Sequence, residues 1–349
     1  MREYKSKVIV DKYFLKKQLT RGEDNISAIK RLVDNSIQAY ESLERKNDIC
    51  EVLVDIFDDL IVVKDNSGGI NENISEVELF RIGGKSNDKL SGVGLKKALF
   101  KLGDRIKIES NKKENSKIFT LNFKDKNSNE IGIGTASIHY NLNSKIGTKV
   151  CISDLEDDVK REILSNKLEN ELLLNFSKIY RKKINKKLVK IKINNKEVKS
   201  SDINGKKLVE KKFGENCYIS LYKKNEGEKS GVDFFINDYL IENRAKWANL
   251  TENKHSYKNC IVEISTFGNK EDILLKREDI KYEMIKFIKE NKRYFIAKER
   301  IIQFEEPAEV VEEMMEYYEV DTAKALGKKG FNKLYQEFEN VKKKKFYKY

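Results

Sequence analysis

Apolar residues recur along this chain with two different periods, and each period predicts a different secondary structure. Residues 25–45 place apolar side chains at intervals of three and four, which predicts a helix with one apolar face. Residues 51–65 alternate Val, Leu and Ile with polar residues around a short turn, which predicts two strands. Residues 92–103 begin with two closely spaced glycines and continue with helical spacing, so we expect a glycine-rich loop that leads into a helix.

The same patterns divide the rest of the chain. They predict strands between 105 and 155, helices over 157–185, strands over 188–266, a helix over 281–303 and amphipathic helices over 308–318 and 321–341. This order predicts an α+β protein that begins with an α/β sandwich, a mixed sheet with helices on one face. We expect an N-terminal domain over 1–157, a smaller α/β domain over 158–303, and a helical, basic C-terminal segment over 304–349.

Composition narrows the class of protein. The net charge of +13 favours an anionic partner, nucleic acid first, although a chain rich in lysine throughout would carry the same charge. No apolar run approaches the roughly 20 residues that cross a bilayer, and the N-terminus has no apolar signal core. The four cysteines form no CxxC pair, and with only two histidines a zinc site is not expected. We therefore expect a cytoplasmic protein without a membrane partner.

Two polar residues stand out within the first domain. Asn35 lies within the apolar pattern of the first long helix, where an amide needs a polar partner such as a phosphate-bound metal, or a bond to a neighbouring loop. Asp65 ends a strand and is followed by a turn with Gly68 and Gly69. A carboxylate there can accept a bond from an exocyclic amine, while the glycines admit a flat base; alone, the segment also fits an ordinary hairpin turn.

A third segment, residues 82–98, carries the features of a phosphate site. Gly92 and Gly94 open a helix, so free backbone N–H groups and the positive end of the helix dipole face an anion. Lys85 and Lys96 add mobile positive charge. Further along, Thr148 enters a strand and its hydroxyl can bind water or a base beside Asp65.

Taken in this order, the four motifs resemble the GHKL superfamily of Bergerat-fold ATPases (gyrase, heat-shock-90 chaperone, histidine kinase, MutL). The resemblance covers about residues 20–155 and implies ATP and Mg²⁺ as ligands. It implies the following roles: Asn35 on magnesium, Asp65 on the adenine amine, Gly69 shaping the pocket, Gly92 and Gly94 around the phosphates with Lys85 and Lys96 nearby, and Thr148 supporting the adenine contact. The family usually has glycine where this chain has Ser67.

One departure bears on catalysis. The ATPase branches usually carry a glutamate one helical turn before the asparagine, and that position is Arg31 here. Arginine cannot act as a base near neutral pH, although it can bind the γ-phosphate. Glu23 and Asp34 are other carboxylates nearby in sequence, but neither lies one turn before Asn35. Residues 270–280 are similar to the MutL-like segment with a lysine that reaches the γ-phosphate, which implies this role for Lys276. Alone, the position also fits a solvated lysine at the end of a strand.

The leading hypothesis is an ATP-gated conformational switch. In MORC and MutL relatives closure joins two protomers, so the resemblance implies a homodimer clamp, here acting on nucleic acid in DNA maintenance or defence against foreign DNA. The strand-turn-strand at 231–241, with Trp247 after it, looks like the MORC-type second domain. The alternatives are a non-hydrolysing nucleotide-dependent scaffold and a heat-shock-90-like chaperone. The acidic and basic stretches after 304 fit a protein partner for the C-terminal helices and a polyanion-binding end, or equally a solvated helix and a disordered end.

Overall fold

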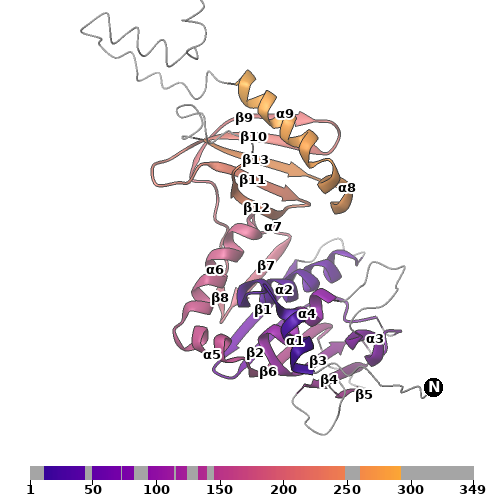
Figure 1. Cartoon of the computed structure of the whole chain (residues 1–349). Helices are drawn as coiled ribbons and strands as arrows, with labels where there is room; N and C mark the ends of the chain where they lie inside the picture. The colour runs from indigo at the N-terminus through magenta and orange to yellow at the C-terminus, as the bar shows by residue number, and fades with distance from the viewer. Residues whose placement is uncertain are drawn as a thin grey trace, which may run out of the picture. The chain divides into compact units, whose positions relative to one another are not determined.

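Two separate β-sheets organise the protein (Figure 1). The computed structural model describes residues 12–43, 49–71, 73–81, 93–113, 115–123, 133–139, 145–247 and 260–291. All of these ranges lie within one compact unit of the chain, residues 1–295. The helices predicted beyond residue 304 lie outside the described residues. Within the described ranges, no helix is long and apolar enough to cross a membrane.

The first sheet has eight strands in the order β5-β4-β3-β6-β2-β1-β7-β8. Its strands are β1 (Cys50–Phe57), β2 (Leu60–Asp65), β3 (Gly103–Asn111), β4 (Ser116–Asn122), β5 (Ile133–His139), β6 (Gly147–Leu155), β7 (Val189–Ile193) and β8 (Lys196–Glu197). All neighbours are antiparallel except β1 and β7, so the sheet is mixed, as predicted. The register between β2 and β6 pairs Lys64 with Lys149, which brings the end of β2 to the start of β6.

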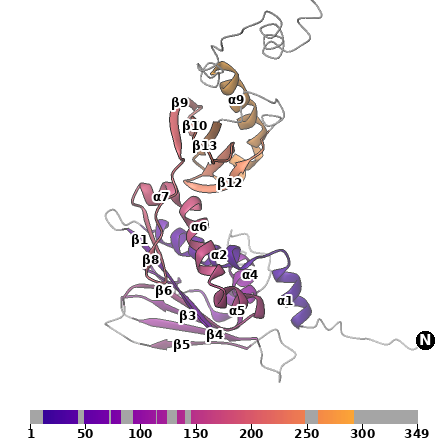
Figure 2. The same cartoon turned by 90° about the vertical axis from the view of Figure 1, so that its left-hand side faces the viewer.

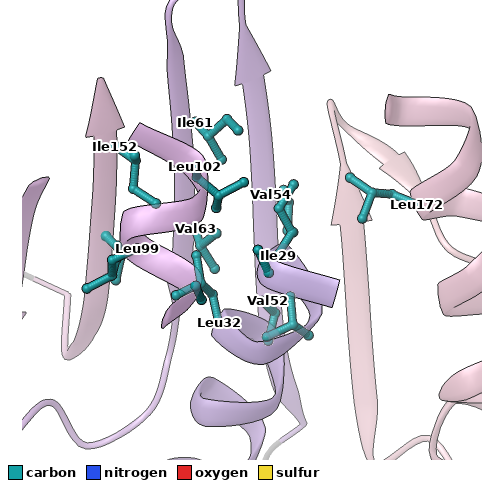
Figure 3. Packing of buried hydrophobic residues seen from close by; sticks show 14 of the residues in the cluster. Ile29, Leu32, Val52, Val54, Ile61, Val63, Leu99, Leu102, Ile152 and Leu172 are labelled. Carbon is teal, nitrogen blue, oxygen red and sulfur yellow. The ribbon is translucent and has the colours of Figure 1, made fainter. Parts of the chain in front are cut away.

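Helices cover one face of this sheet (Figure 2). They are α1 (Lys12–Thr20), α2 (Asn25–Glu41), α4 (Val93–Leu102), α5 (Asp157–Leu164) and α6 (Lys167–Ile179); the short α3 (Glu76–Phe80) follows β2. Alternate strand residues such as Val52 and Ile106 are fully buried against the helices, because side chains of a strand point to opposite faces. Figure 3 shows Ile29 and Leu32 of α2 and Leu99 of α4 packed on this core.

The first sheet draws on more of the chain than its strand pattern indicated. The pattern predicts strands over 188–266 within the second domain, but β7 pairs in parallel with β1 of the first sheet, with Val189 opposite Cys50. The connection through α5, α6 and α7 (Arg181–Asn185) therefore returns the chain to the first sheet before the second sheet begins. Alternating apolar residues at 189–193 predict a strand but not its partner, because the same pattern suits either sheet.

The second sheet has five strands in the order β12-β11-β13-β10-β9. Its strands are β9 (Gly205–Phe213), β10 (Cys217–Lys224), β11 (Gly231–Ile236), β12 (Tyr239–Ala245) and β13 (Cys260–Thr266), and it is followed by α8 (Lys270–Leu275) and α9 (Arg277–Glu290). Met284 and Phe287 of α9 are fully buried in its core, and Trp247 packs on the Phe234 ring at a centroid distance of 5.0 Å. The sandwich and the smaller α/β sheet thus confirm the predicted fold class; the domain boundaries themselves stay a prediction.

Buried charges tie α7 to the second sheet. Arg181 is 5% exposed and binds Asp233 and Glu263, and Asp233 is itself fully buried. Burial by itself raises the pKa of Glu263, but the charges of Lys182 and Arg181 outweigh it and hold the pKa below its usual value. Such a cluster is costly to break, because removing one partner leaves an uncompensated buried charge.

Candidate functional site

Asp65 sits at the end of β2, where the strand leaves the sheet. Its Oδ1 atom accepts hydrogen bonds from the backbone N–H groups of Ser67 and Thr148, at N···O distances of 2.9 and 2.8 Å. Both donors therefore fix the carboxylate from one side. Oδ2 makes no hydrogen bond with the described residues, and the residue is 8% exposed. The arrangement presents one oriented acceptor atom to an incoming donor.

Ser67 and Thr148 complete this end of the site. Their hydroxyl oxygens lie 3.4 Å apart, and Ser67 is fully buried. Two loops far apart in sequence thus meet at Asp65, because β2 and β6 are neighbours in the sheet. The serine that replaces the expected glycine keeps its backbone N–H on Asp65, so this departure from the family pattern does not disturb the carboxylate. The predicted proximity of Asp65 and Thr148 is present in the structure.

Glycines allow the turn after Asp65 to lie close to its neighbours. Gly69 has φ +77°, and a Cβ there would lie 2.9 Å from the hydroxyl oxygen of Ser110. Ser110 in turn accepts the backbone N–H of Ile70 at 2.7 Å, which fixes the turn on β3. Gly147 has φ +146°, and a Cβ there would overlap the Asp65 carbonyl oxygen. Only glycine fits both positions, because a side chain meets strained backbone and occupied space together.

On α2, the two predicted phosphate-end residues lie on the exposed side of the helix. Asn35 is exposed, although the sequence placed it among apolar positions, and its amide makes no hydrogen bond with the described residues. Arg31, one turn earlier, has 43% of its side chain exposed. The helix begins at an Asp24 cap, whose carboxylate accepts the backbone N–H of Ser27 at 2.6 Å. Asn35 is therefore free to meet a ligand rather than a loop of the described chain.

Arg31 does have a protein partner, which the sequence did not predict. Its Nε atom lies 2.7 Å from Oε1 of Glu23, and its Nη2 atom lies 3.2 Å from Oε2. Lys97 of α4 also pairs with Glu23, at 3.2 Å. Burial by itself raises the pKa of Glu23, but hydrogen bonds from Arg31 and Lys97 outweigh it and lower the pKa. Glu23 precedes the helix, so no helical periodicity could have related it to Arg31.

The start of α4 lies beside Arg31. A Cβ at Gly94 would stand 3.6 Å from an Nη atom of Arg31, so the first turn of α4 and the guanidinium are neighbours. Lys96 differs from expectation: it is 4% exposed rather than mobile, and burial lowers its pKa. Lys85 and Gly92 lie outside the described residues. The structure thus brings Arg31 and Gly94 together, which the sequence predicted only through the family resemblance.

Lys276 lies in the segment that follows the second sheet. It is exposed at the junction of α8 and α9, after the second sheet, and not at a strand end. The structure describes no contact between it and Arg31, Asn35 or Asp65. Its neighbour Arg277 binds Glu242 at 2.6 Å and lies over the Trp247 ring.

Residues 25–150 match a family model described as histidine kinase-, DNA gyrase B- and HSP90-like ATPase. Among solved structures, the ATPase domain of the bacterial mismatch repair endonuclease MutL from Aquifex aeolicus is 18% identical, with a TM-score of 0.43 over 75% of this chain and 97% of that one. A mutated form of the same domain is 18% identical, with a TM-score of 0.42 over 71% of this chain and 90% of that one. No curated protein matches the chain.

Proposed function

We propose that this protein binds ATP between Asp65 and the start of α4 and acts as a nucleotide-gated switch. The match of residues 25–150 to the family model of histidine kinase-, DNA gyrase B- and HSP90-like ATPases supports this proposal. The observation that carries the proposal is the carboxylate of Asp65. Two backbone N–H groups hold its Oδ1 atom and leave Oδ2 as an oriented acceptor. The exocyclic amine of adenine is a donor that suits this atom, whereas a purine with a carbonyl at that position offers a second acceptor.

The start of α4, at the end of the site away from Asp65, is where the phosphates of ATP would bind. Backbone N–H groups in the first turn of a helix attract anions, and α4 begins at Val93. Arg31 stands beside Gly94 with 43% of its side chain exposed, and guanidinium groups bind phosphate through two parallel hydrogen bonds. ATP would thus be bound by hydrogen bonding at the base and by charge at the phosphates.

Asn35 fits a magnesium ion that accompanies the phosphates. Mg²⁺ usually takes one or two protein oxygens and completes its shell with water and substrate phosphates. The exposed amide of Asn35, on the same face of α2 as Arg31, offers one such oxygen. When bound, the ion would neutralise phosphate charge; the chain's own contribution is to place Asn35 and Arg31 side by side.

The direct test is ATP binding by the purified full chain. Titration calorimetry with Mg²⁺ and a non-hydrolysable ATP analogue should give one site per chain. The same titration with the matching guanosine analogue should give much weaker binding, because its carbonyl opposes Oδ2 of Asp65. Equal binding of both analogues, or of neither, contradicts the proposed site.

A homodimer clamp is the form of switch that the resemblance to MORC and MutL relatives favours. We propose that ATP closes the site, that Lys276 then reaches the γ-phosphate, and that two protomers associate. Light scattering of the full chain should show a doubling of mass with the analogue and Mg²⁺, and a monomer with ADP. A mass that does not respond to nucleotide rejects the clamp while leaving ATP binding intact.

Nucleic acid is the proposed substrate of this clamp, with a role in DNA maintenance or defence against foreign DNA. Support comes from the net charge of +13 and from exposed lysines on the edge strand β9, among them Lys206 and Lys212. Binding through phosphates releases counterions, so the affinity should fall steeply with salt. Removing the basic residues 342–349 should weaken it further. A chain that retains neither DNA nor RNA at low salt would contradict this part.

A non-hydrolysing scaffold is the second candidate, and Arg31 is the observation that favours it. An arginine at the position of the usual base supports ATP binding but not activation of water. The two candidates separate in a steady-state phosphate-release assay.

A further inference from the structure

Glu23 is a buried carboxylate that the binding of ATP does not require. Only 3% of its side chain is exposed, and its backbone N–H donates to Thr20 at the end of α1 at 3.0 Å. It precedes α2, yet its two oxygens reach across to Arg31 of α2 and Lys97 of α4. Two helices, α2 and α4, therefore each place a cation on this one carboxylate, next to the proposed phosphate site.

Its location matches the place where a base is missing. Arg31 occupies the helix position where the ATPases that this chain resembles carry a glutamate. Its guanidinium contacts Glu23 and also lies beside Gly94 at the start of α4. A γ-phosphate bound to Arg31 would therefore lie one guanidinium group away from Glu23. In this chain a carboxylate is therefore present in the segment before α2, and not on the helix itself.

The other nearby carboxylate is not available in the same way. Asp34 accepts a hydrogen bond from Tyr180 at 2.8 Å through one oxygen and pairs with Lys30 at 2.6 Å through the other. Neither partner belongs to α4. Of Glu23 and Asp34, Glu23 is thus the carboxylate that pairs both with Arg31 and with a lysine of α4.

The ion pairs of Glu23 also hold it inactive. A general base works best when its pKa lies near the working pH, and two cations lower the pKa of this carboxyl group. The phosphates of ATP are stronger competitors for Arg31 and Lys97 than a single carboxylate, because they offer more charge and more oxygens. Binding of ATP would transfer these cations from Glu23 to the phosphates.

We propose that Glu23 is the general base of ATP hydrolysis, masked by Arg31 and Lys97 until ATP takes these cations from it. In this step a water oxygen bonds to the γ-phosphorus while the bond to the bridging oxygen breaks, and ADP leaves with that electron pair. The proton of the water passes to a Glu23 carboxylate oxygen. The inference rests on the proposed ATP site and adds a hydrolytic residue with its regulation.

The test uses the full chain with Mg²⁺ and compares phosphate release with binding of the non-hydrolysable analogue. The variants are Glu23→Gln, Arg31→Gln and their combination. Asp158→Asn is the matched control, because it removes a carboxylate paired with Lys101, one turn further along α4. Glu23→Gln should lower kcat by about 10²-fold or more and keep the affinity for the analogue within a few-fold. Asp158→Asn should change neither.

Arg31→Gln tests the masking of Glu23 in the free chain. It should weaken analogue binding, because the phosphates lose one cation, and it should move the acid limb of kcat/KM to higher pH, because Glu23 of the free chain then keeps only Lys97 as a partner. The turnover that remains in Arg31→Gln should vanish in the double variant. The proposal is wrong if Glu23→Gln keeps the parent rate, if the double variant turns over as fast as Arg31→Gln, or if the parent chain binds the analogue but releases no phosphate from ATP.

Folding is checked by thermal unfolding of each variant. If Glu23→Gln does not fold, Glu23→Asp carries the test, since it keeps the negative charge for Arg31 and Lys97 but withdraws the carboxylate. It should lower kcat clearly, and an unchanged kcat overturns the proposal. Folded protein that binds no analogue at all would instead reject the proposed ATP site, so the two failures are distinguishable.

Discussion

Replacing Asp65 with asparagine should invert the base preference of the site. Asparagine keeps the Oδ1 acceptor that the N–H groups of Ser67 and Thr148 use, so the turn should keep its shape. The second atom, however, changes from an acceptor to an NH₂ donor, which would face the adenine amine, another donor. Losing one buried hydrogen bond costs about 1–3 kcal/mol, or about 5- to 150-fold in the dissociation constant for ATP.

Inosine triphosphate provides the discriminating measurement, because it differs from ATP by an oxygen in place of the amine. Titration calorimetry should find that Asp65→Asn weakens ATP and strengthens inosine triphosphate relative to the parent chain. Asp55→Asn, on the neighbouring strand β1, removes the same charge from the same sheet and should leave both affinities unchanged. A folded Asp65→Asn variant with the parent's preference for ATP would refute the role of Asp65.

Three further perturbations test the structure around the site. Gly147→Ala should lower the stability measured in thermal unfolding by more than about 3 kcal/mol, because the methyl group would overlap Asp65 in addition to straining the backbone. Gly214→Ala is the control: it has open space around it and should cost only the backbone strain, about 1–3 kcal/mol. Arg181→Met should cost about 3 kcal/mol in urea unfolding, because it leaves Asp233 and Glu263 partly uncompensated; an unchanged midpoint would contradict the account of this cluster. Since the pKa of Glu263 is lowered in the folded protein, its contribution is present at neutral pH and is lost as the pH falls below 4.5, so melting temperatures should drop there, and less so in Arg181→Met.

Local patterns of the sequence predicted much of the first sheet. The spacing of Ile29, Leu32 and Val33 predicted α2, and all three are buried in the structure. The alternation at 51–65 predicted β1 and β2. The short helix α3 has no helical period long enough to predict it, although the capping box of Ser75 and Glu78 is a sequence signal for its start.

Contacts between distant segments were harder to predict. The approach of Thr148 to Asp65 followed from the family resemblance, not from periodicity, because strand pairing depends on the whole sheet. Glu23 and Arg31 interact across the start of a helix, where no periodic rule applies. The burial of Lys96 was not predicted either. A lysine beside glycines is typical of a solvent-exposed loop, and the exposure of this side chain depends on how α4 packs against the rest of the domain.

The most direct test of ATP binding at this site is a crystal structure of the full chain with Mg²⁺ and a non-hydrolysable ATP analogue. The account predicts the adenine amine within hydrogen-bond distance of Oδ2 of Asp65, the γ-phosphate at Arg31, and the amide of Asn35 on the metal. An analogue bound elsewhere, or adenine density with no contact to Asp65, would contradict it.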